Sequence, residues 1–169
     1  MSLLVRPATE ADLPLLARMN KRLIEDEGSR NPMSIEQLTG RMRGWLSGDW
    51  EIRLFVDHAA PLGYAVYQPR PDEYFPDRTV VYLRQFYIER EVRGRGWGKQ
   101  ALSTLVHEHF PPGSAVVIDV LASNPGGFAF WRRVGFDPYC TTMHLRSGSR
   151  PEPAGDSDRI GFPLQRTHP

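Results

Sequence analysis

The chain has 169 residues, a length that is typical of one compact domain and short for two. Hydrophobic residues make up 40% and charged residues 24% of it, which excludes a disordered chain and a membrane-embedded one. The 21 basic and 20 acidic residues leave a net charge of +1, so we expect no nucleic acid and no membrane among its partners. The single cysteine, Cys140, excludes an intrachain disulfide and a multi-cysteine zinc site, and the N-terminal residues lack the apolar core of a signal peptide. We therefore expect a cytoplasmic protein that binds no metal.

The first half of the chain is expected to form a strand, two helices and a hairpin. Apolar residues from Leu13 to Ile24 recur with the period of a helix that buries one stripe. Ser34 can cap the amide of Gln37 and so begins the second helix. The predicted elements are a strand at 3–5, helices at 13–24 and from 35, and strands at 51–57 and 62–68 joined by a turn at 58–61.

The second half alternates strands with helices. The run 115–121 is almost wholly apolar, which suits the buried middle of a mixed sheet. Asn124 and Gly135 frame a short helix as its N-cap and its C-terminal stop. The predicted elements are a loop at 70–78, a strand at 80–88, a helix at 98–110, the strand at 115–121, the short helix and a last strand at 136–145.

Residues 1–146 are taken as a single domain. The remainder, 147–169, is rich in Pro, Gly, Ser and charge and is expected to be a loosely ordered tail. Within it, the run from Ile160 to Phe162 is a candidate edge strand.

A glycine-rich turn between Arg93 and Lys99 carries the clearest chemical signal. Its three alternating glycines precede an amphipathic helix, so backbone N–H groups can converge on an anion at the positive end of the helix dipole. Gln100 follows Lys99 where a P-loop needs Ser or Thr, and Lys99 stands where a dinucleotide fingerprint needs Gly. The turn therefore predicts a phosphate cradle of another kind, and a plain chain reversal is the alternative.

Two signatures occur in a specific order along the chain. The first is Arg93-x-x-Gly96-x-Gly98, and the second is Asn124 followed by the run Phe130 to Phe136, in which an aromatic pair precedes Gly-Phe. With these signatures the sequence resembles the GNAT family of acyl-CoA-dependent N-acyltransferases.

The resemblance extends from Leu3 to about Leu145. It implies an α/β fold with a central mixed, mostly antiparallel sheet that is flanked by about four helices. It also implies a splay between the fourth and fifth strands, which admits the pantetheine arm of acetyl-CoA.

The resemblance assigns a set of residues to acetyl-CoA. Backbone groups of the fourth strand would pair with pantetheine, and amides of the glycine turn would bind the pyrophosphate. Asn124 would reach pantetheine from the other side, and a plain N-cap is an equally good role for it. The expected binding residues are Phe86, Tyr87, Ile88, Arg93, Gly94, Arg95, Gly96, Trp97, Gly98, Lys99, Asn124 and Trp131.

Catalysis requires a base, because an alkylammonium with a pKa of ~10.4 is protonated at neutral pH. The resemblance places Asp119 where many relatives carry a carboxylate near the acceptor amine. Asp119 is also the only charge in its apolar strand, where burial would raise its pKa, and an ion pair with Arg84 is the structural alternative.

The chain departs from the family at Trp131, which stands where a tyrosine usually protonates the leaving thiolate, and an indole cannot donate that proton. Tyr139, Tyr87 or water would replace it, or the thiolate leaves unassisted, and we take Tyr139 as the candidate. Trp131 also suits packing.

Acidic residues predict the acceptor side. Glu25, Asp26 and Glu27 end the first helix, and the resemblance implies that the segment after this helix lines the acceptor site. We expect these three acids, with Asp72 and Glu73 of the loop at 70–78, to form a negative mouth that attracts an ammonium group. Glu27, Glu73 and Tyr74 are the expected acceptor contacts, and an ordinary solvated surface is the alternative.

The function predicted from the sequence is direct transfer of an acetyl group from acetyl-CoA to a primary amine of a small molecule or a peptide. A non-catalytic acyl-CoA-binding or sensing module and an acetyltransferase of protein N-termini or lysines are the alternatives, and a homodimer stays open.

Overall fold

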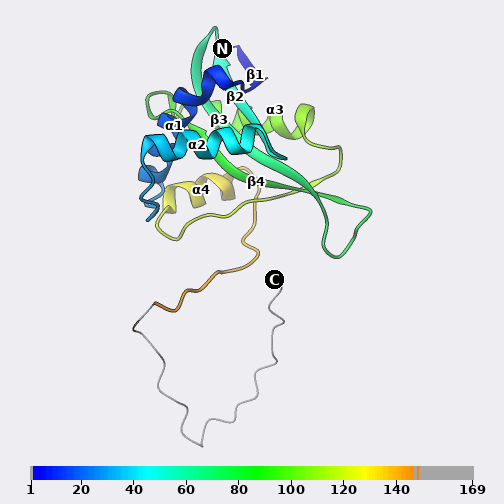
Figure 1. Cartoon of the computed structure of the whole chain (residues 1–169). Coiled ribbons are helices and arrows are strands. Elements are labelled where there is room, and N and C mark those ends of the chain that lie inside the picture. The colour runs from blue at the N-terminus through cyan, green and yellow to red at the C-terminus, as the bar shows by residue number, and fades with distance from the viewer. Residues whose placement is uncertain (1, 147, 149–169) are drawn as a thin grey trace, which may run out of the picture. The chain divides into compact units, whose positions relative to one another are not determined.

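The computed structural model describes residues 2–146 and 148 (Figure 1). The chain divides into two units, Met1–Asp137 and Pro138–Pro169. All the helices and strands of the described residues lie in the first unit. The predicted tail, including the run from Ile160 to Phe162, lies outside the described residues except for Gly148.

The first unit is built on a five-stranded sheet with the order β1-β2-β3-β4-β5. Neighbouring strands from β1 to β4 are antiparallel, whereas β5 is parallel to β4. The prediction of a mixed, mostly antiparallel sheet is thereby confirmed. The strands are β1 Leu3–Pro7, β2 Glu51–Asp57, β3 Ala60–Pro71, β4 Thr79–Ile88 and β5 Ala115–Val117.

Helices cover both faces of the sheet (Figure 1). One core cluster joins the first two helices to Leu54 and Tyr64 of the sheet, and another joins the third helix to Phe55 and Leu83. Trp131 of the fourth helix packs against this second cluster. The helices are α1 Leu13–Asp26, α2 Ile35–Leu46, α3 Trp97–Thr104 and α4 Pro125–Arg133. Two short 3-10 helices, η1 Glu10–Asp12 and η2 Arg90–Val92, and a π-helix, η3 Leu105–His109, complete the set.

The caps of α1 and α2 follow from local side-chain chemistry. Ser34 Oγ accepts the backbone N–H of Gln37 at 3.2 Å, as predicted. Ahead of α1, the carboxylate of Asp12 accepts the N–H of Thr9 at 2.8 Å and both terminal nitrogens of Arg6 at 2.8 and 2.9 Å. Hydrogen bonds from Arg6 lower the pKa of Asp12 to about 2. This ion pair anchors the start of α1 to β1.

Two predicted strands differ from those observed. The hairpin turn comprises only His58 and Ala59, both with positive φ, so β3 begins at Ala60. β5 ends at Val117 instead of Leu121, because it pairs with β4 over only three residues. It also lies at the edge of the sheet, with Val117 46% exposed, and the prediction of a buried central strand is wrong.

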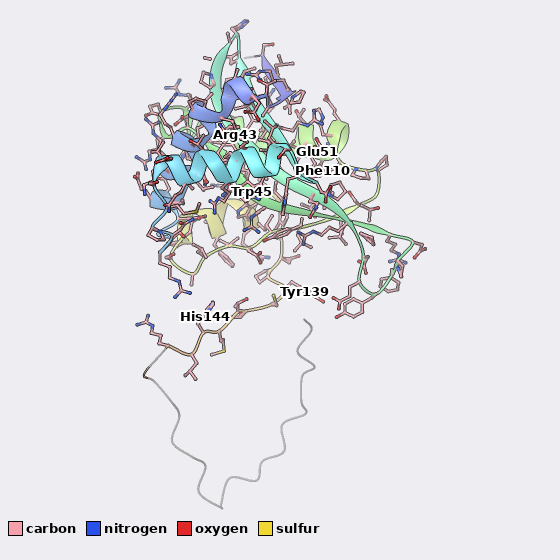
Figure 2. All side chains as sticks on the ribbon, viewed as in Figure 1. Arg43, Trp45, Glu51, Phe110, Tyr139 and His144 are labelled. Atoms are coloured by element: carbon pink, nitrogen blue, oxygen red, sulfur yellow. The ribbon has the colours of Figure 1, made fainter. Side chains whose placement is uncertain are left out.

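The predicted last strand at 136–145 is absent from the described residues. Residues 138–146 of the second unit form neither helix nor strand, and Tyr139 is 93% exposed (Figure 2). Aromatic and apolar residues favour a strand, but a strand also needs a pairing partner, which the sequence pattern does not reveal.

The sheet opens between β4 and β5. The two strands pair only where Val80–Tyr82 meets Ala115–Val117, and over the rest of β4 no strand of the described residues pairs on that side. The pairing with β3 continues to Ile88 and matches Val66 with Gln85 but Tyr67 with Leu83. Arg84 is therefore the extra residue of a β-bulge, which turns Arg84 and Gln85 to the same face of the sheet.

Candidate active site

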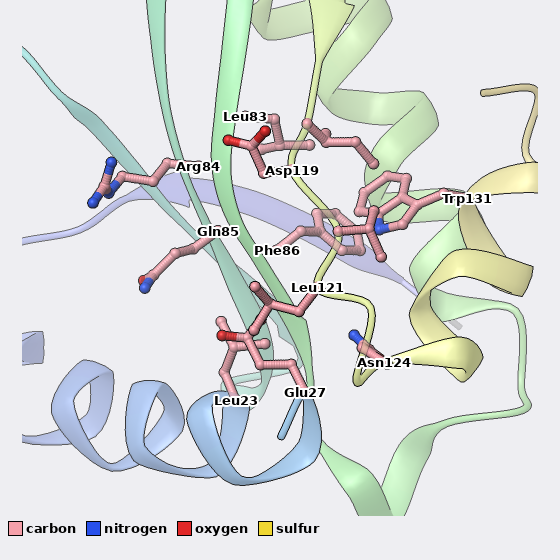
Figure 3. Close-up of a pocket in the computed structure, with 12 residues that line it drawn as sticks. Leu23, Glu27, Leu83, Arg84, Gln85, Phe86, Asp119, Leu121, Asn124 and Trp131 are labelled. Atoms are coloured by element: carbon pink, nitrogen blue, oxygen red, sulfur yellow. The ribbon is translucent and has the colours of Figure 1, made fainter. Parts of the chain in front are cut away.

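A cavity of about 90 Å³ lies along the open edge of β4 (Figure 3). The end of α1, the middle of β4, the segment 118–121 after β5 and α4 surround it. Its lining includes Glu27, Phe86, Asp119, Asn124 and Trp131. The structure therefore brings together five residues that the sequence analysis assigned to cofactor, acceptor or catalysis.

A second cavity of about 220 Å³ adjoins the first. It extends toward α2 and includes Arg41 and Tyr82 in its lining. A group that enters along β4 and one that enters from the α2 side would meet where the two cavities join. The five residues that line both are Glu27, Arg84, Gln85, Asp119 and Leu121.

The open edge of β4 presents backbone groups to the first cavity. The N–H of Glu89 donates to the carbonyl of Leu62 at 2.8 Å, and a Cβ on Gly63 would lie only 2.0 Å from the carbonyl oxygen of Tyr87. Tyr87 and Glu89 thus turn their backbone groups toward β3. Because the direction alternates along a strand, Phe86 and Ile88 turn theirs toward the open edge.

Tyr87 itself is turned away from the cavity. Its side chain is only 1% exposed, and its hydroxyl donates to Glu89 Oε2 at 3.0 Å. Burial, together with the neighbouring carboxylate of Glu89, raises the pKa of Tyr87 to about 12. Of the predicted pantetheine contacts on β4, the geometry favours Phe86 and Ile88.

The glycine turn has the backbone conformation that its sequence suggests. Gly94 and Gly96 have φ values of 76° and 87°, which are rare for residues with a side chain, and a Cβ on either would project into open space. Gly96 is the N-cap of α3, whose first amides lack acceptors within the helix. Arg95 and Lys99 are exposed beside it. The turn can therefore bind an anion through its backbone.

Gly98 has a second role, in packing. A Cβ there would lie 3.2 Å from Cε2 of Phe130 on α4 and 3.6 Å from Cγ1 of Ile88. Trp97 beside it is buried in the core, where it anchors the start of α3.

Arg93 is engaged on the protein itself. Its guanidinium donates to Asp26 at 2.5 Å and to the carbonyl of Ile88 at 2.8 Å. Arg90 also donates to Asp26, at 2.8 Å, and to Glu25 at 2.9 Å. Burial by itself would raise the pKa of Asp26, but the hydrogen bonds from Arg90 and Arg93 outweigh it and lower that pKa. The expectation that Glu25 and Asp26 face the acceptor is wrong, because both bind arginines.

Glu27 is separated from the other two predicted acceptor residues. It is half-buried and lines both cavities, and burial raises its pKa while Arg41 opposes the rise. Glu73 and Tyr74 lie in the loop before Thr79, at the opposite end of β4, and line neither cavity. The three residues do not form one mouth.

Asp119 lies two residues beyond β5 and lines both cavities. It is exposed, so the predicted burial is wrong. Its carboxylate accepts the hydroxyl of Tyr82 at 2.6 Å, and the alternative partner, Arg84, instead lies over the rings of Trp45 and Trp50. Burial raises the pKa of Tyr82, and its hydrogen bond to Asp119 raises it further.

Asn124 and Trp131 close the far side of the first cavity. Asn124 Oδ1 accepts the N–H of Gly127 at 2.8 Å, so this residue caps α4 and lines the cavity at once. Trp131 lines the cavity and packs edge-on against Phe86, with ring centroids 5.4 Å apart. Tyr139 belongs to the second unit, and its catalytic role stays a prediction.

The sequence analysis missed Arg41, Tyr82 and Gln85. Arg41 donates to Asn20 Oδ1 at 2.8 Å, and Gln85 Oε1 accepts the hydroxyl of Tyr64 at 2.9 Å. Arg41 shares the apolar stripe of α2 with Leu38, Met42 and Trp45, and a charge in such a stripe is a signal that could have revealed it.

The described part of the chain shows neither a membrane-spanning helix nor a metal-binding cluster. None of its helices combines the length and the apolar character that crossing a membrane requires. The same residues contain no group of three or more side chains suited to holding a metal ion.

Solved structures share this fold. A mutant of a Bacillus halodurans protein has 22% identity and a TM-score of 0.70, over 85% of this chain and 98% of that one. A predicted acetyltransferase of Clostridium acetobutylicum, solved with acetyl-CoA, has 19% identity and a TM-score of 0.67, over 86% and 96%. An aminoglycoside N-acetyltransferase in complex with CoA has 16% identity and a TM-score of 0.69, over 86% and 94%.

Sequence comparison identifies the family. No curated protein matches the sequence significantly. The model of the acetyltransferase (GNAT) family matches residues 20–136, which include the end of α1, the open edge of β4, the glycine turn and α4. The chain therefore belongs to the GNAT family of acetyltransferases.

Proposed function

We propose that the enzyme transfers an acetyl group from acetyl-CoA directly to the primary amine of a small acceptor. The observation that carries the proposal is the pair of adjoining cavities, one along the open edge of β4 and the other toward α2. The glycine turn follows directly after β4, so one strand connects the phosphate end of the donor to its reactive end.

Acetyl-CoA would bind largely through backbone groups. The amides of the turn and of the first residues of α3 would take the pyrophosphate, with Arg95 and Lys99 supplying positive charge. Phe86 and Ile88 would pair with pantetheine as a further strand does, and Asn124 and Trp131 would flank it. Arg93 would fix the position of the turn through its hydrogen bonds to Asp26 and to the carbonyl of Ile88.

Two carboxylates can prepare the amine. The acceptor arrives as an ammonium, gives one proton to a base and attacks the thioester carbonyl carbon through its nitrogen lone pair. The C–S bond then breaks, the thiolate takes up a proton, and the nitrogen loses one of its two remaining protons to solvent, which leaves a neutral amide. Asp119 is the base expected from the sequence, and Glu27 is a second candidate, because burial raises its pKa toward the working pH.

The thiolate needs little help to leave. A thiol pKa of ~8.5 makes the thiolate a tolerable leaving group near neutral pH. Tyr139 remains the candidate proton donor, and water is the alternative.

The size of the second cavity favours a small acceptor over a folded protein. Its volume of about 220 Å³ is below the ~300–1,000 Å³ of sites for drug-sized ligands. A short amine fills such a space.

The test is the release of CoA from acetyl-CoA in the presence of a panel of primary amines, with a reaction lacking amine as the control for hydrolysis. We expect amine-dependent release and one acetyl group on each product molecule by mass spectrometry. Binding of acetyl-CoA without transfer to any amine would contradict the proposal.

A further inference from the structure

The second cavity is lined by side chains of both charges. Arg41 of α2 and Arg84 of β4 supply positive charge, and Glu27 and Asp119 supply negative charge. Figure 3 shows that Arg84 and Gln85 project to the side of β4 opposite to Phe86, while Glu27 and Asp119 approach from other elements. A ligand that complements this lining carries a cation and an anion.

Among the described residues, the two arginines have no carboxylate at ion-pair distance, and only Glu27 acts on Arg41 at longer range. Within residues 2–146 and 148, neither Arg41 nor Arg84 forms an ion pair with a carboxylate. Arg41 donates to the neutral amide oxygen of Asn20, and its Nε is buried without a hydrogen-bond partner. Arg84 lies over the rings of Trp45 and Trp50, at 5.3 and 5.5 Å from their centroids.

The neighbouring arginines behave differently. Arg22 donates to Glu89 at 2.5 Å, while Arg90 and Arg93 bind the acids at the end of α1. These three arginines are thus paired with carboxylates, whereas the two that line the second cavity are not. Burial lowers the pKa of Arg41 and the positive charge of Arg84 adds to this, while Tyr64 and Glu27 oppose the shift only in part. An anion bound between these two cations would offset both the burial of Arg41 and its repulsion by Arg84.

We infer that the acceptor is a small zwitterion in which a carboxylate accompanies the reacting amine, as in an amino acid. Arg41 and Arg84 bind the carboxylate, because a planar guanidinium matches its two oxygens. Glu27 and Asp119 hold the ammonium where the two cavities meet, which is where the acetyl group arrives. This inference rests on the proposed function and narrows its acceptor.

The experiment compares each of four amino acids, namely alanine, serine, valine and leucine, with its own carboxamide. The amine of the carboxamide is less basic, so more of it is neutral at pH 7, and a preference for the acid cannot come from amine reactivity. We expect kcat/KM to be about 10- to 100-fold higher for the acid, the range given by charge-assisted hydrogen bonds.

Substitutions test whether the two arginines cause the preference for the acid over its carboxamide. Arg41→Gln and Arg84→Gln should each reduce the ratio of acid to carboxamide by about tenfold or more, and Arg41→Lys should restore part of it. The matched controls are Arg43→Gln, an exposed arginine on α2, and Arg70→Gln, which also stacks on Trp50 but lines neither cavity. Both controls should keep the wild-type ratio.

Binding provides a readout that does not require turnover. With CoA present, at least one of the four amino acids should raise the melting temperature more than its carboxamide does, and Arg41→Gln should remove the difference. Equal use of acid and carboxamide, or a ratio that survives both arginine variants, would overturn the inference and leave the acetyltransferase activity standing. Absence of transfer to every amine would defeat the proposed function, and the melting temperatures would then decide the inference by themselves.

Discussion

The glycine turn and the second cavity are built in opposite ways. The turn is one continuous segment, from Arg93 to Lys99, that offers backbone amides. The cavity draws its charged side chains from α1, α2, β4 and the segment after β5. A backbone site suits a ligand that stays constant, such as the phosphates of the donor, whereas a side-chain site can change its ligand by substitution. On the proposed function, donor and acceptor recognition can therefore be altered separately.

The largest effect is expected from Gly96→Val. Gly96 has a φ of 87°, which is strained for a residue with a side chain, and the branched side chain of valine would occupy the space beside the first amides of α3. Acetyl-CoA affinity should fall by about 100-fold or more, the loss of two charge-assisted hydrogen bonds, in calorimetry on folded protein. Gly44→Val, where a Cβ also meets open space but lies on α2, is the control. Wild-type affinity in folded Gly96→Val would reject the turn as the phosphate site.

The next effect separates the two candidate bases on the acceptor side. A base must be deprotonated to act, so kcat/KM should fall as the pH drops through its pKa, and the raised pKa of Glu27 places this limb above the ordinary range of a glutamate near ~4.3. If Glu27 is the base, Glu27→Gln should lower kcat by about 100-fold and remove the limb.

Asp119→Asn is the matched variant for this comparison. Loss of the limb in Asp119→Asn alone would assign the base to Asp119. Full rates and unchanged pH profiles in both variants would show that neither carboxylate takes the proton. Either substitution should change acetyl-CoA affinity only slightly, because the phosphates bind at the turn, outside both cavities, and pantetheine binds backbone groups of β4.

The smallest effect tests the scaffold that carries Glu27. Arg6 lowers the pKa of Asp12, so this pair stabilises the fold above the unfolded-state pKa of ~3.9 and loses its contribution as the pH falls toward about 2. Asp12→Asn should reduce the free energy of unfolding at pH 7 by about 1 kcal/mol, since Arg6 is partly exposed and the pair is screened by solvent.

Urea unfolding at several pH values measures this difference, which should shrink as the pH drops from 4 to 2. Acetyl-CoA affinity should stay unchanged in Asp12→Asn. If the variant and the wild type differ in free energy of unfolding by the same amount at every pH, the ion pair is not the cause of that difference.

The same contrast explains what the sequence could predict. The turn, the caps at Ser34 and Asn124, and the core stripes are local patterns, and the structure agrees with them. The pairing of Asp26 with Arg93, 67 residues away, is not visible in any local pattern. The length of β5 depends on how far β4 pairs with it, so the sequence misjudged the surroundings of Asp119.

The residues around the second cavity were hidden for a related reason. In the sequence, Arg41 is simply a helix residue and Tyr82 a strand residue. They line one cavity only because the chain folds α2 and β4 close together. Adjacent polar residues at 84 and 85 broke the alternation of β4, and this break was a readable sign of the bulge.

The bulge divides β4 into two stretches of opposite phase. Before it, even-numbered residues such as Tyr82 face α2, whereas after it odd-numbered residues such as Tyr87 do. Arg84 is not paired with any residue of β3. A substitution at position 84 therefore leaves the register between β3 and the stretch that ends at Ile88 unchanged. On the proposed function, substitution at position 84 therefore changes which acceptor binds, while the edge at Phe86 and Ile88 keeps the geometry that binds the donor.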